Sequence, residues 1–113
     1  MTVYTAPGQP DSLVTVQGRY GHYIGGAWVD PVKGAYFENI SPVNGKPFTE
    51  IARGTAEDIE AALDAAHAAA PSWGKTSTTE RANILLKIAD VMDENLTAIA
   101  VAETWENGKP VRE

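Results

Sequence analysis

The stretch Thr55–Trp73, TAEDIEAALDAAHAAAPSW, has a helical period that decides the fold class of this chain. Thr55 followed by Asp58 is a capping-box pattern, which predicts where the helix begins. One apolar stripe at helical spacing follows, formed by Ile59, Ala62, Leu63, Ala66 and Ala70. Pro71 is expected to end the helix. Because alanine buries little area, the stripe should lie close against a larger body of structure.

A second amphipathic helix is predicted after Ser77, where Glu80 completes another capping box. Its apolar positions are Ile84, Leu85, Ile88, Met92, Leu96 and Ile99. Asn95 is able to end one segment and cap the next, so we expect two helices with a kink between them. Gly108 followed by Pro110 is typical of a helix end.

Upstream of the helices, residues 22–52 alternate strand-like runs with turn residues, which predicts an antiparallel meander of short strands. The sequence NGKP at Asn44–Pro47 falls between Ile40 and Phe48, and Asn-Gly favours a tight hairpin turn there. The same four letters return at Asn107–Pro110, where they mark the helix end. The flanking periods differ, so the two copies do not indicate an internal repeat.

The first twenty residues read differently, with Pro7, Gly8, Pro10 and Gly18 interrupting one short β-like run, Leu13–Val16. We predict an extended arm over residues 1–20 whose order depends on a neighbour. Residues 21–113 are expected to form the folded α/β part.

Composition excludes several classes of function. The net charge of −6 and the pI near 4.8 argue against nucleic acid or an anionic membrane as a partner. The 113 residues contain no cysteine, which excludes disulfides, thiolate metal sites and a cysteine nucleophile. No signal-peptide pattern is present, and no run reaches the roughly 18 apolar residues of a membrane span. We therefore expect a cytoplasmic protein.

The residues able to carry chemistry form no complete active site. His22 and His67 lack a second ligand at metal spacing, which favours structural or surface roles over catalysis. The acids of the helices are more typical of solvated faces than of a divalent-ion site. Neither Gly25-Gly26 nor Gly45-Lys46 fits a phosphate-binding loop.

Four larger side chains have two interpretations each. Trp28, Trp73 and Trp105 are able to stack on a ligand, but core or subunit anchoring is the commoner role. Lys109 is either a cation near the negative end of a helix, which we favour, or a ligand-facing charge.

Several motifs together resemble one family. They are YIGGAWVD from Tyr23, NISPVNGKPFTEIARGTAEDIEAALDAAHAA from Asn39, Trp73, ERANILLKIADVMDEN from Glu80 and ETWENGKP from Glu103. In order and spacing, residues 20–113 resemble the amino-terminal region of NAD(P)-dependent aldehyde dehydrogenases. The wording AAHAAAPSWGKTS and AVAETWENGKPVRE is most similar to bacterial enzymes acting on acetaldehyde and other small aldehydes.

The resemblance implies an α/β fold in which residues 21–113 are the amino-terminal part, meander and two or three helices, of an incomplete Rossmann-like coenzyme-binding domain. It implies a larger homo-oligomeric enzyme that uses NAD or NADP, a cysteine nucleophile and a general-base glutamate. The cysteine, the glutamate and the glycine-rich coenzyme loop fall outside the part of the family pattern that this chain covers. The resemblance therefore assigns no catalytic or coenzyme-binding residue to this chain.

One site does carry over from the resemblance. Many family members hold a monovalent cation with main-chain carbonyls before the Asn-Pro or Ser-Pro turn and with an acid before NGKP. The corresponding residues are Asn39, Ile40 and Glu106, although members often have Asp where Glu106 stands. Oxygen ligands suit a hard cation.

Two functions follow from the sequence. The first is a fragment of an aldehyde-oxidising dehydrogenase that is inactive on its own, with the remainder of the enzyme or other subunits as partners. The alternative is a free-standing acidic interaction module that binds a partner protein through its helix stripes. In either case the uncovered stripes predict marginal stability and a tendency to associate.

Overall fold

The computed structural model describes residues 3–113 and confirms an α/β chain in which the strands precede the helices. The strands are β1 Arg19–Tyr20, β2 His22–Ile24, β3 Ala27–Val29, β4 Tyr36–Ile40 and β5 Pro47–Ala52. The helices are α1 Ala56–Lys75, α2 Thr78–Glu94 and α3 Leu96–Asn107. None of the helices in the described residues is long and apolar enough to span a lipid bilayer.

Two hairpins form among the strands. Strands β2 and β3 pair antiparallel around Gly25-Gly26, whose φ angles of 62° and 82° suit a two-residue turn. Strands β4 and β5 pair antiparallel around the first NGKP, with Gly45 at φ 68°. This confirms the hairpin turn predicted at Asn44–Pro47.

The hairpins do not join into one meander, so that part of the prediction was wrong. They belong to two sheets, β2-β3 and β1-β5-β4, and β1 runs parallel to β5 with Arg19 opposite Glu50. Pro31 has no N–H for a ladder, and Gly34 donates to the Pro31 carbonyl oxygen at 2.8 Å. This turn carries the chain from one sheet to the other.

The amino-terminal arm also differs from the prediction. Leu13–Val16 forms no strand, and the Gly8 N–H instead donates to the Val14 carbonyl oxygen at 2.9 Å, which closes a loop. The end of the arm enters the sheet as β1. Met1 and Thr2 lie outside the described residues.

Helix α1 begins where the sequence predicts but ends later. The Thr55 N–H donates to Asp58 Oδ2 at 2.8 Å, and the helix starts at the next residue. Pro71 lies inside the helix, which continues to Lys75, so its predicted end was wrong. Proline removes its own N–H donor and its ring crowds the carbonyl four residues earlier, but in the last turn the Ser72 and Thr76 hydroxyls supply extra bonds to carbonyl oxygens.

The signals of the later helices are confirmed. Ser77 and Glu80 form a reciprocal capping box, with the two hydrogen bonds at 3.0 and 3.1 Å. Helices α2 and α3 meet at Asn95, as predicted. Its side chain donates to the Val91 carbonyl oxygen at 2.8 Å, so it closes α2 and does not cap α3. Gly108, at φ 81°, ends α3.

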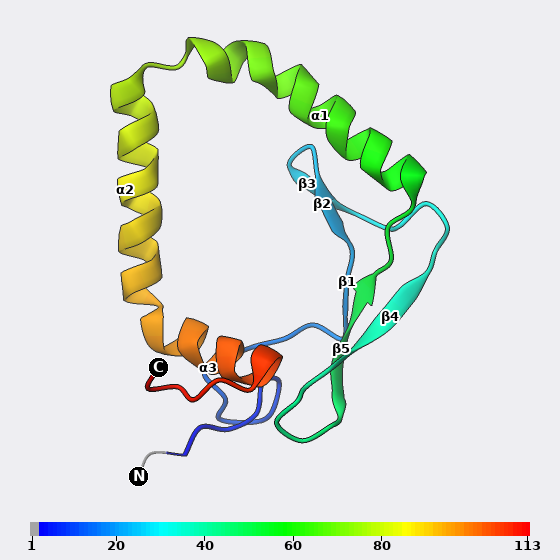
Figure 1. The fold of residues 1–113 in the computed structure, drawn as a ribbon, viewed down its shortest axis with the longest axis vertical. Coiled ribbons are helices and arrows are strands. Elements are labelled where there is room, and N and C mark those ends of the chain that lie inside the picture. The colour runs from blue at the N-terminus through cyan, green and yellow to red at the C-terminus, as the bar shows by residue number, and fades with distance from the viewer. Residues whose placement is uncertain (1–2) are drawn as a thin grey trace.

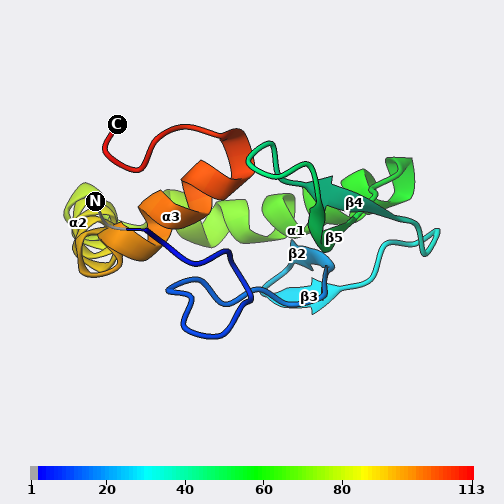
Figure 2. The same cartoon turned by 90° about the horizontal axis from the view of Figure 1, so that it is seen from below.

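The elements form an open frame (Figure 1). Seen after a turn of 90°, this frame is thin (Figure 2). Its radius of gyration is 17.5 Å, whereas a compact chain of this length has about 13 Å. Among the described residues, the buried hydrophobic side chains are those of Ala52 and Val101. Helix α2 has no buried residue, and Leu85 is 68% exposed. The apolar stripes predicted for the helices therefore have little to pack against within this chain.

Candidate functional site

The end of strand β4 meets the end of helix α3. We call this contact, between residues 39–42 and 105–108, the β4–α3 junction. The Asn39 side-chain amide donates to both Glu106 carboxylate oxygens at 3.0 Å. Next to it, the buried Ser41 hydroxyl donates to the Trp105 carbonyl oxygen at 2.5 Å. The junction thus joins segments that lie more than sixty positions apart in the sequence.

Local sequence prepares both sides of the junction. The register of β4 shifts between Asn39 and Ile40, which re-aims the end of the strand. On the other side, Gly108 terminates α3 in the left-handed conformation, and a Cβ there would lie 3.4 Å from Pro42 Cγ. A larger residue at 108 would therefore be both strained and crowded.

The three residues predicted to hold a monovalent cation fall at this junction. Asn39 and Glu106 are in contact, and Ile40 is adjacent in the strand. Both Glu106 carboxylate oxygens accept a hydrogen bond from the Asn39 side-chain nitrogen, and a nitrogen that donates cannot bind a cation. The oxygen atoms of the predicted set do suit a hard ion. The proximity fits the predicted set, and occupancy by a cation stays a prediction. Within residues 3–113, no three His, Cys, Asp or Glu side chains gather as metal ligands do.

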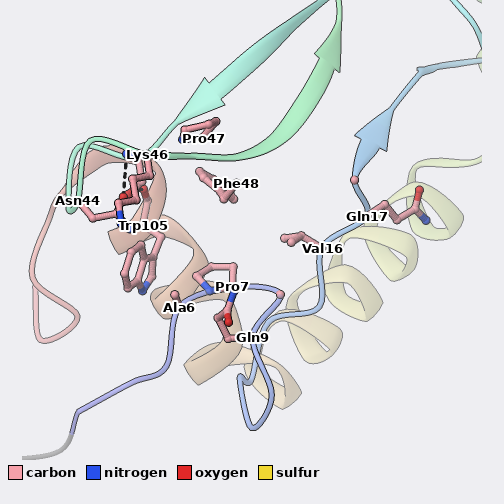
Figure 3. A pocket seen from close by; sticks show the side chains of 13 residues that line it. Ala6, Pro7, Gln9, Val16, Gln17, Asn44, Lys46, Pro47, Phe48 and Trp105 are labelled. Carbon is pink, nitrogen blue, oxygen red and sulfur yellow. Dashed lines mark hydrogen bonds between the residues drawn. The ribbon is translucent and has the colours of Figure 1, made fainter.

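A pocket of about 390 Å³ opens beside the junction (Figure 3). It lies between the amino-terminal arm, the β4–β5 turn and Trp105. Its walls combine apolar side chains such as Phe48 and Val16 with polar ones such as Gln17 and Lys46. The Ser41 hydroxyl at its edge already donates to the Trp105 carbonyl oxygen, and no histidine is among the described residues that line the pocket. Those residues therefore form no activated nucleophile. The sequence did not predict this pocket, because it depends on the arm folding back.

Asp58 forms a second polar cluster at the start of α1. Its buried carboxylate accepts the Val32 N–H at 2.9 Å and the Thr55 N–H at 2.8 Å. These two backbone bonds, the Val32 bond first, lower the pKa of Asp58 below its usual 3.8. His22 Nε2 lies 3.8 Å from Asp58 Oδ1. The Asp58 carboxylate fixes the Pro31–Gly34 turn against α1. Among the described residues His22 Nε2 has no hydrogen-bond partner, and the structural or surface role of His22 stays a prediction.

The remaining candidates make no contact with the predicted cation ligands among the described residues. His67 is exposed on α1, and Lys109 is exposed just after α3. Trp28 is 63% exposed and packs edge-on against Tyr23 with ring centroids 5.2 Å apart. Trp73 is 49% exposed, so among the described residues neither it nor Trp28 anchors a core. The subunit contact that was the other part of their interpretation stays a prediction.

Comparison with known proteins shows which protein family this chain matches. The model of the aldehyde dehydrogenase family matches residues 28–113. The chain is 68% identical to an aldehyde dehydrogenase of Deinococcus radiodurans over 110 residues, which are 97% of this chain and 21% of that protein. It is 64% identical to an acetaldehyde dehydrogenase of Pseudomonas aeruginosa, with 98% and 22% covered. A long-chain-aldehyde dehydrogenase of Acinetobacter is 61% identical, with 97% and 22% covered.

The fold is also shared with a solved structure. The NAD+ complex of an aldehyde dehydrogenase from Bacillus cereus superposes with a TM-score of 0.78 at 32% identity, covering 83% of this chain and 20% of that one. The chain spans about a fifth of the length of the relatives it matches.

Proposed function

The chain belongs to the aldehyde dehydrogenase family, and from this premise we propose that it is the amino-terminal part of an enzyme that oxidises an aldehyde to a carboxylic acid with NAD(P)+. The observation that supports this most strongly is the 68% identity along 97% of the chain. The solved relative contains NAD+, which supports a nicotinamide coenzyme for the complete protein. That coenzyme accepts the hydride when bound.

The chain alone should be inactive. Oxidation through a covalent intermediate needs a nucleophile that attacks the carbonyl carbon, and the 113 residues contain no cysteine. Neither the β4–α3 junction nor the pocket beside it supplies a serine activated by a base. The role of this part is therefore architectural, with the apolar stripes of α1 and α2 lying against the remainder of the protein.

The substrate class is a narrower proposal. The motifs around Pro71 and Trp105 support acetaldehyde and other small aldehydes, as does the relative named for acetaldehyde. The relative named for long-chain aldehydes is nearly as similar over this part. Side chains outside these 113 residues must therefore shape most of the aldehyde-binding surface.

The proposal is tested by assaying two proteins for aldehyde-dependent formation of NADH and NADPH. One is the purified 113-residue chain, and the other is the complete protein that its gene encodes. We expect no turnover by the chain and turnover by the complete protein, fastest with acetaldehyde rather than a long-chain aldehyde. A chain sample that is free of contaminating enzyme and still reduces NAD+ would contradict the inactivity.

Reading the coding sequence past residue 113, together with the intact mass of the protein in its source, tests the alternative. A continuation that contains a cysteine in a Gly-Gln-x-Cys context supports the enzyme. A stop codon at that point supports the free-standing interaction module. The cytoplasmic location and the homo-oligomeric state stay predictions from the sequence.

A further inference from the structure

The two copies of NGKP have the same covalent sequence but different surroundings. Asn44 lies in the turn between β4 and β5, and Asn107 is the last residue of α3. Both side chains are exposed, and each Asn is followed by a glycine. A glycine leaves its own backbone nitrogen unshielded, because it has no Cβ. This is the arrangement in which that nitrogen reaches the preceding side-chain carbonyl carbon most easily.

We propose that Asn44 is a site of spontaneous deamidation and that Asn107, in the identical sequence, is protected by its contacts within α3 and at the β4–α3 junction. In the first step the Gly45 nitrogen bonds to Asn44 Cγ, and the bond from Cγ to Nδ2 breaks. The proton lost by the Gly45 nitrogen leaves with Nδ2 as ammonia, and a cyclic succinimide remains. Water then opens the ring to aspartate or to isoaspartate, and no oxidant or reductant is required.

The leaving groups are held differently. Asn107 Nδ2 donates to Glu103 Oε1 at 2.6 Å, a short bond to a charged acceptor. Among the described residues, Asn44 Nδ2 has no such partner, while its Oδ1 accepts the Lys46 N–H at 3.0 Å. Asn107 Oδ1 makes the equivalent bond to the Lys109 N–H at 2.8 Å. The bond to Glu103 is therefore the difference between the two amides.

The attacking nitrogens also differ in their freedom to move. Both glycine N–H groups donate to a carbonyl oxygen at 2.8 Å, Gly45 to Ser41 and Gly108 to Thr104. No other group lies within 4 Å of a Cβ placed on Gly45, whereas one on Gly108 would meet Pro42 at 3.4 Å. Ring closure needs rotation of the backbone between the two residues. This rotation is open at Gly45 and pushes against Pro42 at Gly108.

The test is a time course of the intact 113-residue chain at mildly alkaline pH, with each product located by peptide mass spectrometry and an isoaspartate-specific methyltransferase. Tryptic peptides 34–53 and 88–112 carry one copy each, because trypsin does not cut before proline. We expect Asn44 to react on the order of tenfold faster, which corresponds to about 1.4 kcal/mol of barrier. Similar rates at the two sites, or a faster reaction at Asn107, would overturn the proposal.

Two controls isolate the cause. In urea the two identical sequences should react at similar rates, because the contacts that distinguish them are gone. The variant Glu103→Ala should accelerate Asn107 and leave the Asn44 rate unchanged, which also shows that the turn is still folded. If Asn44 still reacts tenfold faster in urea, or if Glu103→Ala does not change the Asn107 rate, the proposed protection of Asn107 is wrong.

Discussion

The β4–α3 junction and helix α2 are both built from strong local signals, yet they differ in what surrounds them. At the junction, Ser41 is almost completely buried and Asn39 pairs with Glu106, and Val101, one turn earlier in α3, is buried too. Helix α2 has a complete capping box but no buried residue. Polar contacts of the junction find their partners within these residues, whereas the apolar face of α2 needs a partner from elsewhere. Capping decides where a helix begins, and burial decides whether it is stable.

The largest expected effect is on amide hydrogen exchange of the isolated chain. Amides of α2 should exchange nearly as fast as those of an unfolded peptide, since little is lost when the helix opens. Amides in β5, which pairs with both β1 and β4, should be the most protected. Exchange read out by mass spectrometry on short peptides checks this. Equal protection of α2 and β5 would show that α2 is already covered, for example by self-association.

Two substitutions sharpen the same comparison. Val101→Ala removes two methyl groups from a side chain with 0% exposure and should destabilise the chain by about 2 kcal/mol. Ile88, on α2, is 48% exposed, so Ile88→Ala should change the free energy of unfolding by less than about 0.5 kcal/mol. Urea unfolding followed by tryptophan fluorescence measures both. If the Ile88 variant lost as much as the Val101 variant, the exposure of α2 would not hold in solution.

Low pH should reduce the stability of the structure at the start of α1. The backbone N–H groups of Val32 and Thr55 lower the pKa of Asp58, so its contribution to stability is complete above its unfolded value of 3.8. That contribution is lost as the pH falls through the lower folded pKa. Asp58→Asn should therefore flatten the dependence of stability on pH in this acid range, as measured by thermal melting.

The matched control for this experiment is Glu80→Gln. Glu80 also has a lowered pKa because of its bond to the Ser77 hydroxyl, but it caps the exposed helix α2. This variant should reduce acid-dependent helicity without changing the melting of the strand region. A loss of acid sensitivity in the strands of the Glu80 variant would contradict the assignment to Asp58.

The smallest expected effect concerns the cation predicted at the β4–α3 junction. If Asn39, Ile40 and Glu106 bind K+ or Na+, either ion should raise the melting temperature relative to choline at equal ionic strength. Glu106→Gln removes the charge and should abolish that difference. The contact between Asn39 and Glu106 is exposed, and its own contribution should be below about 1 kcal/mol. Identical melting temperatures in K+, Na+ and choline would contradict cation binding at the junction.

Much of the local structure was predictable because its causes act within a few residues. The Thr55–Asp58 and Ser77–Glu80 caps set the helix starts, and the glycines at 45 and 108 allow the left-handed backbone of their turns. Pro71 is the exception, since its cost was outweighed by the helix on either side. The family motifs were equally readable, because they are residue identities at fixed spacing.

The sequence by itself therefore determined most of the elements, the starts of the predicted helices, the family and the absence of cysteine. Only the tertiary structure decided that β1 runs parallel to β5, that Asn39 meets Glu106 and that Pro42 borders Gly108 in the second NGKP copy. These contacts join residues up to 67 positions apart or depend on what packs nearby. No local preference specifies such a pairing, because it forms only when the free energy of many contacts together exceeds the entropy cost of ordering the chain.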